Sequence, residues 1–245
     1  MSGLVATVDG LREQVALASR IVAAEGYADL TLGHLSARVP GEDVILIKRK
    51  GIALDEVEPD DVVEVRLDGR QPDGGGTEIH LETVLHTEVY RARADVGAVV
   101  HGHPLYATAL AATDAPLEPL THDAVLFHEG LGRYGDSADL ITAPEQGAAV
   151  ARALGPRRAV LMRNHGVVVV GRDVPWAVVA AATLERASRV QAIARALGRT
   201  RPLTSESAAR LAPLKYRDPF VEEYWEAWIR RIRRNGGDGW RSSSG

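Results

Sequence analysis

Apolar positions along the chain recur at two spacings, one typical of helices and the other of strands. Between residues 8 and 25 the apolar side chains keep helical spacing, and Gly26 follows where a helix is expected to end. Pro144 and Gly155 bracket another such segment, because proline favours the first turn of a helix and glycine the position after its end. Helical spacing predicts three further helices, over residues 80–93, 104–112 and 175–197.

Short apolar runs flanked by turn residues predict the strands. Three of them, over residues 30–41, 44–47 and 62–69, follow one another closely, so we expect them to pair antiparallel. Two later runs end at His101 and at Met162, and the last covers residues 167–170. The order of helix, strands, helix, strand, helix, strand and helix is typical of a mixed α/β domain.

The C-terminal part predicts one more helix and then a tail. A basic run over residues 230–234 is preceded by aromatic side chains at helical spacing, which are Tyr216, Phe220, Tyr224, Trp225 and Trp228. We expect this helix to pack its aromatic face on a neighbour and to end in solvent. Glycine and serine predominate over residues 235–245, which predicts a flexible tail. The remaining residues, 1–234, are enough for one substantial core and predict a single domain.

The amino-acid composition excludes several classes of binding partner and of catalytic chemistry. The formal net charge of −4 gives the protein no general attraction for nucleic acid. Cysteine is absent, which excludes disulfides, thiolate ligands and a cysteine nucleophile, and leaves histidine and carboxylates as metal ligands. No stretch approaches the ~18 apolar residues of a membrane span, and the N-terminus lacks a signal-peptide pattern. We therefore expect a cytoplasmic protein without a nucleic-acid or membrane partner.

The most informative motif is His101-Gly102-His103 at the end of an apolar run. On a strand, side chains two positions apart point to the same face, so the two imidazoles can bind one metal ion. Gly102 between them allows another backbone or a ligand to approach closely. His165, followed by Gly166, could supply a third imidazole, and three protein ligands with an open position are typical of catalytic metal sites.

Several motifs, in their order along the chain, resemble those of the class II aldolase and adducin family. They are Thr31-Leu-Gly-His-Leu-Ser-Ala-Arg-Val-Pro-Gly, Lys50-Gly-Ile, Glu82-Thr-Val-Leu-His with Tyr90, Ala98-Val-Val-His-Gly-His-Pro and Arg163-Asn-His-Gly-Val-Val-Val-Val-Gly. The resemblance implies an α/β/α fold around a mainly antiparallel sheet and a divalent metal ion bound by His101, His103 and His165. It also implies that Glu82 coordinates the metal or moves protons. A homotetramer with active sites between subunits is frequent in the family.

Glu82 and His86 stand four positions apart on the helix predicted before the His101 strand. They share a helix face, so they could hydrogen-bond and change each other's pKa, which makes both candidates for catalysis. The alternative is an exposed pair without a role. His122 and His128 fall between the metal-ligand motifs, and three uses stay open for them: lining the pocket, supporting the metal ligands, or capping loops.

The chain departs from the sugar-phosphate aldolases of the family at the positions that select the substrate. Those enzymes hold phosphate with a hydroxylated Thr/Ser-Gly element and a Ser-Ser pair, whereas this chain has Lys48-Arg49-Lys50-Gly51 and His80-Leu81. Backbone amides near Gly51 and the three cations could bind a carboxylate. The alternative is a solvated strand end, in which alternation sends Arg49 to the opposite face from its neighbours.

These observations favour a metal-dependent carbon–carbon lyase acting on a small carboxylate. Neutral imidazoles hold Zn²⁺, Mn²⁺ or Fe²⁺ without cancelling its charge, so the ion keeps its Lewis acidity. Decarboxylation of a hydroxylated aromatic acid and retro-aldol cleavage of a hydroxy acid are both compatible with such a site. Two alternatives are an iron-dependent oxygenase of an aromatic keto acid and a non-catalytic, adducin-like interaction module. No Gly-x-Ser-x-Gly motif supports a serine hydrolase.

Overall fold

Seven strands form one sheet in the computed structural model, which describes residues 7–72 and 74–235. The strand order is β3-β2-β1-β4-β7-β6-β5. All neighbours pair antiparallel except β5 and β6, which are parallel. The strands are β1 (His34–Arg38), β2 (Val44–Lys48), β3 (Val62–Arg66), β4 (Ala98–Gly102), β5 (Gly132–Tyr134), β6 (Ala159–Met162) and β7 (Gly166–Gly171).

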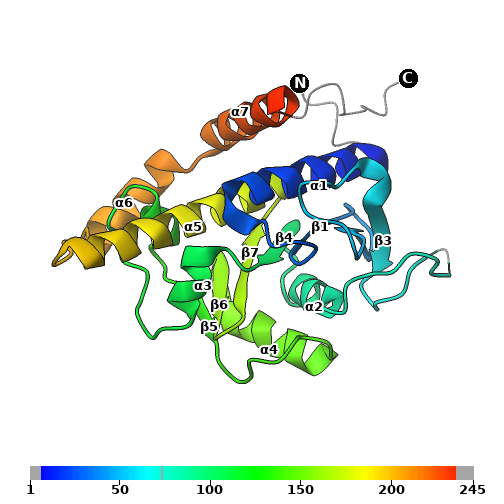
Figure 1. Cartoon of the computed structure of the whole chain (residues 1–245), viewed down its shortest axis with the longest axis horizontal. Coiled ribbons are helices and arrows are strands. Elements are labelled where there is room, and N and C mark those ends of the chain that lie inside the picture. Colours follow the sequence, from blue (N-terminus) through cyan, green and yellow to red (C-terminus); the bar gives the residue numbers. More distant parts are fainter. Residues whose placement is uncertain (1–6, 73, 236–245) are drawn as a thin grey trace.

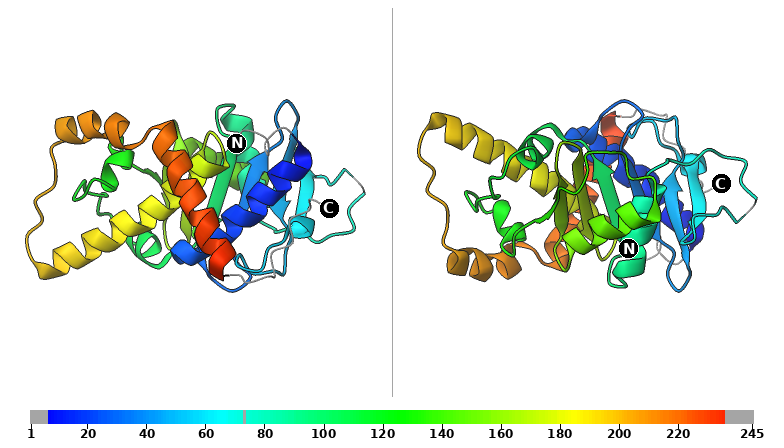
Figure 2. Two further views of the ribbon diagram at one scale, coloured as in Figure 1. Left: turned by 90° about the horizontal axis from the view of Figure 1, so that it is seen from above. Right: turned by 90° about the horizontal axis from the view of Figure 1, so that it is seen from below.

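Helices cover both faces of this sheet (Figures 1 and 2). One face carries α1 (Val8–Val22), α3 (Leu105–Ala111) and α5 (Val174–Leu197), and α7 (Asp218–Asn235) packs on α1 and α5. The other face carries α2 (Thr83–Ala92) and α4 (Pro144–Leu154), which pack on each other. The remaining helical segments are α6 (Ser205–Lys215), two short 3₁₀ helices (Pro59–Asp61 and Ala124–Phe127) and a π-helical turn (Ala23–Tyr27).

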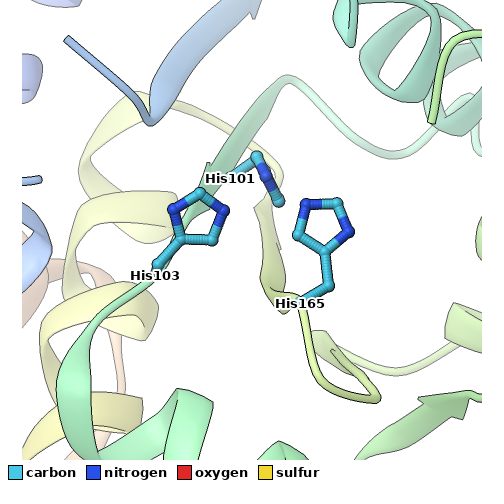
Figure 3. A group of neighbouring side chains, drawn as sticks. All are labelled: His101, His103 and His165. Carbon is cyan, nitrogen blue, oxygen red and sulfur yellow. The ribbon is translucent and has the colours of Figure 1, made fainter. Parts of the chain in front are cut away.

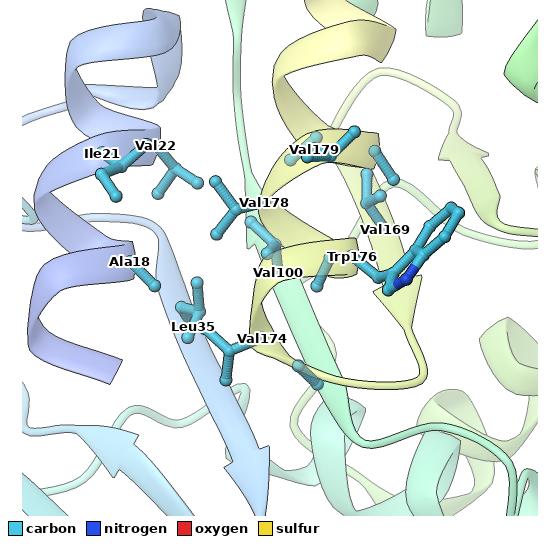
Figure 4. Close-up of a cluster of buried hydrophobic side chains, with 14 of the residues drawn as sticks. Ala18, Ile21, Val22, Leu35, Val100, Val169, Val174, Trp176, Val178 and Val179 are labelled. Carbon is cyan, nitrogen blue, oxygen red and sulfur yellow. The ribbon is translucent and has the colours of Figure 1, made fainter. Parts of the chain in front are cut away.

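Strand alternation divides the apolar side chains between two cores. Leu35, Val100 and Val169 face α1 and α5, where they meet alanine and valine side chains of these helices (Figure 4). Val99 and Val168 face α2 and α4 on the opposite side. The α/β/α arrangement predicted from the sequence is therefore confirmed, as is the antiparallel pairing of the first three strands.

Most predicted helices are present, with shifted ends. The helix predicted over residues 8–25 leaves α-geometry after Val22 and passes through the π-helical turn, in which Gly26 has φ 106°. The long helix begins one residue earlier than predicted, with Asp173 accepting the Trp176 amide as its N-cap. Its apolar face packs on β4, β7, α1 and α3, so the sheet and the neighbouring helices together supply the partner that this face required.

The C-terminal part differs from its prediction. Tyr216 ends α6, a helix that the sequence pattern did not separate, and a new helix begins at Asp218. Arg231 of the basic run pairs with Glu25 at 2.5 Å, so this run is not wholly solvated. The predicted tail, residues 235–245, lies outside the described residues except for Asn235, which belongs to α7. Within residues 7–72 and 74–235, no helix is long and apolar enough to cross a membrane.

Candidate metal centre

Three imidazoles meet at one end of the central strands. His101 lies in β4, His103 follows that strand, and His165 lies in the turn between β6 and β7. Asn164, with φ 55°, occupies the left-handed conformation that this tight turn requires and that asparagine tolerates. One ring nitrogen from each histidine lies within 4.8 Å of those of the other two, and the rings surround a common space (Figure 3). The structure thus brings together the three histidines that the sequence proposed as ligands.

Two glycines allow this close approach. A Cβ at Gly166 would lie 2.6 Å from both the Gly102 carbonyl oxygen and Cδ2 of His103. A Cβ at Gly102 would lie 3.0 Å from the Tyr27 ring. A side chain at Gly166 would push the two histidine-bearing segments apart, and one at Gly102 would press on Tyr27, so glycine at both positions has a steric reason.

Hydrogen bonds determine which ring nitrogen of His101 and of His103 remains free to bind a metal ion. The Nδ1 of His101 lies 3.0 Å from the Val167 carbonyl oxygen, which can only accept, so Nδ1 carries the proton and Nε2 keeps its lone pair. The Nδ1 of His103 lies 2.9 Å from an Asp29 carboxylate oxygen and is held in the same way. This arrangement of a carboxylate or carbonyl behind each imidazole is typical of metal ligands.

The inner nitrogens of the centre lack partners. Among the described residues, His101 Nε2 and both ring nitrogens of His165 are buried without a hydrogen bond. Burial also lowers the pKa of His101, which favours the neutral form that binds metals. Buried polar atoms without a partner are costly, and a bound cation would satisfy them. The residues present therefore fit a divalent metal ion.

Glu82 faces the same space from the residue before α2. Its carboxylate oxygens lie 3.5 Å from His101 Nε2 and 3.4 Å from His165 Nε2. Oε1 also accepts a hydrogen bond of 2.9 Å from the Ile141 amide. Burial raises the pKa of this carboxyl, but the two histidines and the amide outweigh burial and hold the pKa well below its usual range. Glu82 is thus an ionised group next to the candidate ligands.

His86 lies behind the centre and not beside Glu82. Its Nε2 is 2.7 Å from His34 Nδ1, and its Nδ1 is 2.6 Å from the Ser36 hydroxyl, which in turn lies 2.9 Å from the Tyr90 hydroxyl. Both ring nitrogens are engaged, so the expected Glu82–His86 hydrogen bond is wrong. The alternative of an exposed pair is wrong as well, because Glu82 and His86 are both buried.

The buried chain ends at His34, next to the metal centre. His34 pairs with His101 across β1 and β4, and their ring centroids lie 5.0 Å apart. His34, Glu82 and His101 also form a second group whose ligand atoms lie within 4.8 Å of one another. His34 belongs to a family motif, but the sequence predicted no role for it. The alternation from His34 to Ser36 on one strand was the available signal.

The cations before Gly51 have different surroundings. Lys48 is fully buried, and its ammonium donates to the carbonyl oxygens of Thr31 at 3.1 Å and Ile52 at 2.5 Å. Arg49 pairs with Asp61 at 2.8 Å, and Lys50 pairs with Glu78 at 3.3 Å.

Lys48 is the cation whose charge reaches the histidines. After burial, its charge is among the causes that lower the pKa of His80 to about 4, and it also contributes to the lowered pKa of His34. Gly51 is exposed in a left-handed turn at φ 83°. Lys48 alone of the four residues is buried, whereas Arg49 is half-buried and Lys50 and Gly51 are exposed.

The other histidines divide into two groups. His80 belongs to the centre, because its ring centroid lies 4.6 Å from that of His34 and its Nε2 is buried without a partner among the described residues. His122 and His128 are exposed. Asp29, which orients His103, could not be found from the sequence, since no spacing links positions 29 and 103.

Comparisons with known proteins identify the family of the chain. A family model for the class II aldolase and adducin N-terminal domain matches residues 13–192, and the chain belongs to this family. The 3,4-dihydroxyphthalate decarboxylase of Rhodococcus jostii RHA1 is 34% identical over 197 residues, covering 75% of this chain and 79% of that protein. The 4-hydroxy-3-prenylphenylpyruvate oxygenase/4-hydroxy-3-prenylbenzoate synthase of Streptomyces roseochromogenus subsp. oscitans is 33% identical over 153 residues, or 62% of this chain and 55% of that protein.

A solved structure shares the whole fold. The L-fuculose 1-phosphate aldolase of Glaciozyma antarctica PI12 superposes with a TM-score of 0.86 at 26% identity, covering 99% of this chain and 96% of that one. The family relatives thus include a decarboxylase, an oxygenase and an aldolase.

Proposed function

We propose that the protein is a metal-dependent carbon–carbon lyase that decarboxylates a hydroxylated aromatic acid, with retro-aldol cleavage of a hydroxy acid as the second candidate. The observation that carries the proposal is the convergence of His101, His103 and His165 with the ionised Glu82 around unpartnered imidazole nitrogens. A non-catalytic, adducin-like module has no need to keep these four groups together. The relative that decarboxylates a dihydroxyphthalate supports the choice of aromatic acids.

The proposed roles follow from the position of each group. His101, His103 and His165 would hold Zn²⁺, Mn²⁺ or Fe²⁺, and the bound ion would supply Lewis acidity to the substrate oxygen that receives the electron pair. Glu82, being ionised, can accept the proton of the substrate hydroxyl and return it to the ring carbon. The bond between this ring carbon and the carboxylate then breaks, and carbon dioxide leaves. One proton per turnover is taken up from water. His86, itself held by Ser36 and Tyr90, would keep His34 in place beside the metal centre.

Activity screening of metal-loaded protein tests the proposal. Purified protein is analysed for its metal, loaded with Zn²⁺, Mn²⁺ or Fe²⁺, and incubated with hydroxylated aromatic acids, hydroxy acids and sugar phosphates. We expect carbon dioxide release from an aromatic acid without oxygen consumption. Oxygen uptake matched to product would instead establish an oxygenase, the activity that the Streptomyces relative suggests. Preference for a sugar phosphate over every acid would replace the decarboxylase by an aldolase.

Lys48 is the cation that we propose contacts the substrate carboxylate. Its ammonium has three donors, and the carbonyl oxygens of Thr31 and Ile52 use two of them. Lys48→Met is expected to lower kcat/KM on the acid substrate about ten- to a hundredfold, since one charge-assisted contact contributes about 1.5–3 kcal/mol. Lys50→Met is the matched control, because Lys50 pairs with Glu78 at the surface. Equal kinetics of the two variants would exclude Lys48 from substrate binding.

The same contact predicts a pH dependence of KM. Burial lowers the pKa of Lys48 to about 8, so its ammonium loses the proton, and with it the charge, as the pH rises through that value. KM of the parent enzyme is therefore expected to rise above pH 8, while Lys48→Met shows no such rise. Parallel pH profiles of the two proteins would contradict the assignment.

Five leucines around the metal centre support a homo-oligomer, which we propose is a tetramer. The five leucines, each more than half exposed, are Leu30, Leu32, Leu81, Leu105 and Leu140. Along the sequence, each lies within two positions of a residue of the metal centre or of a residue that hydrogen-bonds to the centre. Exposed apolar side chains that gather into one patch mark interaction surfaces, and we propose that these leucines form such a patch. A second copy covering this leucine rim would also exclude water from the site.

Light scattering of rim variants measures this assembly. The parent is expected to have a tetrameric mass at micromolar concentration, and Leu105→Glu, placed at the first residue of α3, is expected to reduce the mass. Leu197→Glu is the matched control, because Leu197 is even more exposed than Leu105 and lies at the far end of α5. A monomeric parent, or dissociation only in the control, would refute the rim as the interface.

A further inference from the structure

A cavity of about 590 Å³ lies at the end of the sheet opposite to the three histidines. Val96, just before β4, and Gly171, at the end of β7, line it, whereas His101 lies near the far end of β4. About five strand residues, or roughly 16 Å, separate the two places. The cavity is therefore distinct from the candidate metal centre.

Arginine predominates in its lining. The five arginines are Arg93, Arg157, Arg158, Arg172 and Arg217. Two of them belong to ion pairs of the wall: Arg93 with Asp95 at 2.6 Å, and Arg172 with Asp218. Arg93 also donates to the Gly155 carbonyl oxygen at 2.6 Å, which fixes the turn between α4 and β6. These two guanidinium groups build the wall and are already neutralised.

The other three arginines form what we call the arginine pocket: Arg157, Arg158 and Arg217. None of them has a carboxylate within 4.0 Å among the described residues, and Glu129 is the one lining carboxylate outside the two ion pairs. With five guanidinium groups and three carboxylates, the lining has a formal net charge of +2. An excess of like charge that the lining carboxylates do not balance is unfavourable, and a bound anion would relieve it.

Trp176 holds part of this charge in a fixed position. The Cζ atoms of Arg158 and Arg172 lie 5.2 and 4.9 Å from the centre of its ring. The indole lies on the side of α5 turned away from α1 (Figure 4), and its Nε1 donates to Asp218 at 3.1 Å. Arg158 is half-buried on this ring; burial lowers its pKa, and the charge of Glu129 opposes that shift only in part. A rigid guanidinium loses little freedom on binding an anion.

We propose that the arginine pocket binds a small organic dianion, a phosphate monoester or a dicarboxylate. Guanidinium groups bind both kinds of oxyanion through paired hydrogen bonds, and a dianion matches the net charge of the lining. The cavity volume falls in the range of about 300–1,000 Å³ typical of pockets for small organic molecules, which exceeds the needs of a simple ion. The inference does not depend on the reaction proposed for the metal centre.

Calorimetric titration of the full-length protein tests the pocket. The probes are phenyl phosphate and succinate, with glycerol as the neutral control. We expect one of the two dianions to bind with one site per chain and glycerol not to bind. Arg158→Gln is expected to weaken this binding about ten- to a hundredfold, the usual effect of one lost charge-assisted contact. Arg199→Gln, an exposed arginine after α5, is the matched control and is expected to bind as the parent does.

Further variants distinguish an anion pocket from binding at the metal centre and from a subunit contact. Arg217→Gln, at an exposed position, is a second test if Arg158→Gln does not fold, and the same weakening is expected. His165→Ala should keep the affinity, because its site lies at the other end of the strands. Loss of binding in His165→Ala with retention in Arg158→Gln would overturn the proposal. So would absence of dianion binding, or a change of assembly in Arg158→Gln with unchanged affinity, which would make the cavity a subunit contact.

Discussion

His165→Ala is expected to lose its metal ion and its activity while keeping its fold. His165 lies in the turn between β6 and β7, so its truncation leaves the pairing of those strands intact. Its loss would leave two imidazoles, which is one ligand fewer than typical catalytic sites use. Since the ion is expected to supply several kcal/mol to the reaction, the turnover of His165→Ala should fall about 10³-fold or more. Elemental analysis and circular dichroism measure metal content and fold, and steady-state kinetics measure turnover.

The same experiment on other histidines gives matched comparisons. His103→Ala is expected to behave like His165→Ala, because the two rings stand on opposite sides of the shared space. His122→Ala and His128→Ala change exposed imidazoles outside the centre and should keep both metal and turnover. Full metal occupancy in His165→Ala or His103→Ala would remove that residue from the ligand set.

Glu82→Gln is expected to lower turnover about 10²-fold or more, the usual effect of losing a proton-transfer group. The amide keeps the size of the side chain, and its oxygen can still accept from the Ile141 amide, so the fold should remain. An amide cannot take up the substrate proton, which is the step assigned to the ionised carboxylate. Steady-state kinetics on the acid substrate found by screening measure the change.

Metal content distinguishes the two roles that stay open for Glu82. If Glu82 only transfers protons, Glu82→Gln keeps the metal of the parent and loses turnover. If Glu82 coordinates the ion, metal affinity falls together with turnover. Glu78→Gln is the control, since this exposed carboxylate pairs only with Lys50 among the described contacts. Unchanged turnover in Glu82→Gln would assign the proton transfer to another group, with His34 the nearest candidate.

Local patterns were sufficient for the mixed α/β class and for singling out the three histidines, whereas the α/β/α layers followed from the resemblance to the family. Alternation on a strand places His101 and His103 on one face, and this follows from backbone geometry alone. The same geometry made the antiparallel pairing of neighbouring strands predictable, because short connections leave few other arrangements. Helix ends were less predictable, since the π-helical turn after Val22 depends on packing and not on a local signal.

Contacts between distant segments were decided by the tertiary structure. His34 and His86 are 52 positions apart, and they meet because β1 lies beside β4 and beneath α2. The i to i+4 spacing suggested Glu82 as the partner of His86, yet packing turned His86 toward β1. Asp29 and His103 are 74 positions apart, and no sequence pattern connects them.

The sequence by itself therefore determined the mixed α/β class and the histidine motifs, because these depend on periodicities and spacings within one segment. The order of its motifs gave the family resemblance, which implied the α/β/α layers and the three histidine ligands. The tertiary structure decided which groups support those ligands, which cation is buried, and that arginines from four separate segments line one cavity. The physical reason is that a side chain's charge state and partners depend on burial and on neighbours from other segments. Strand order and helix packing determine how deeply each side chain is buried and which neighbours it has.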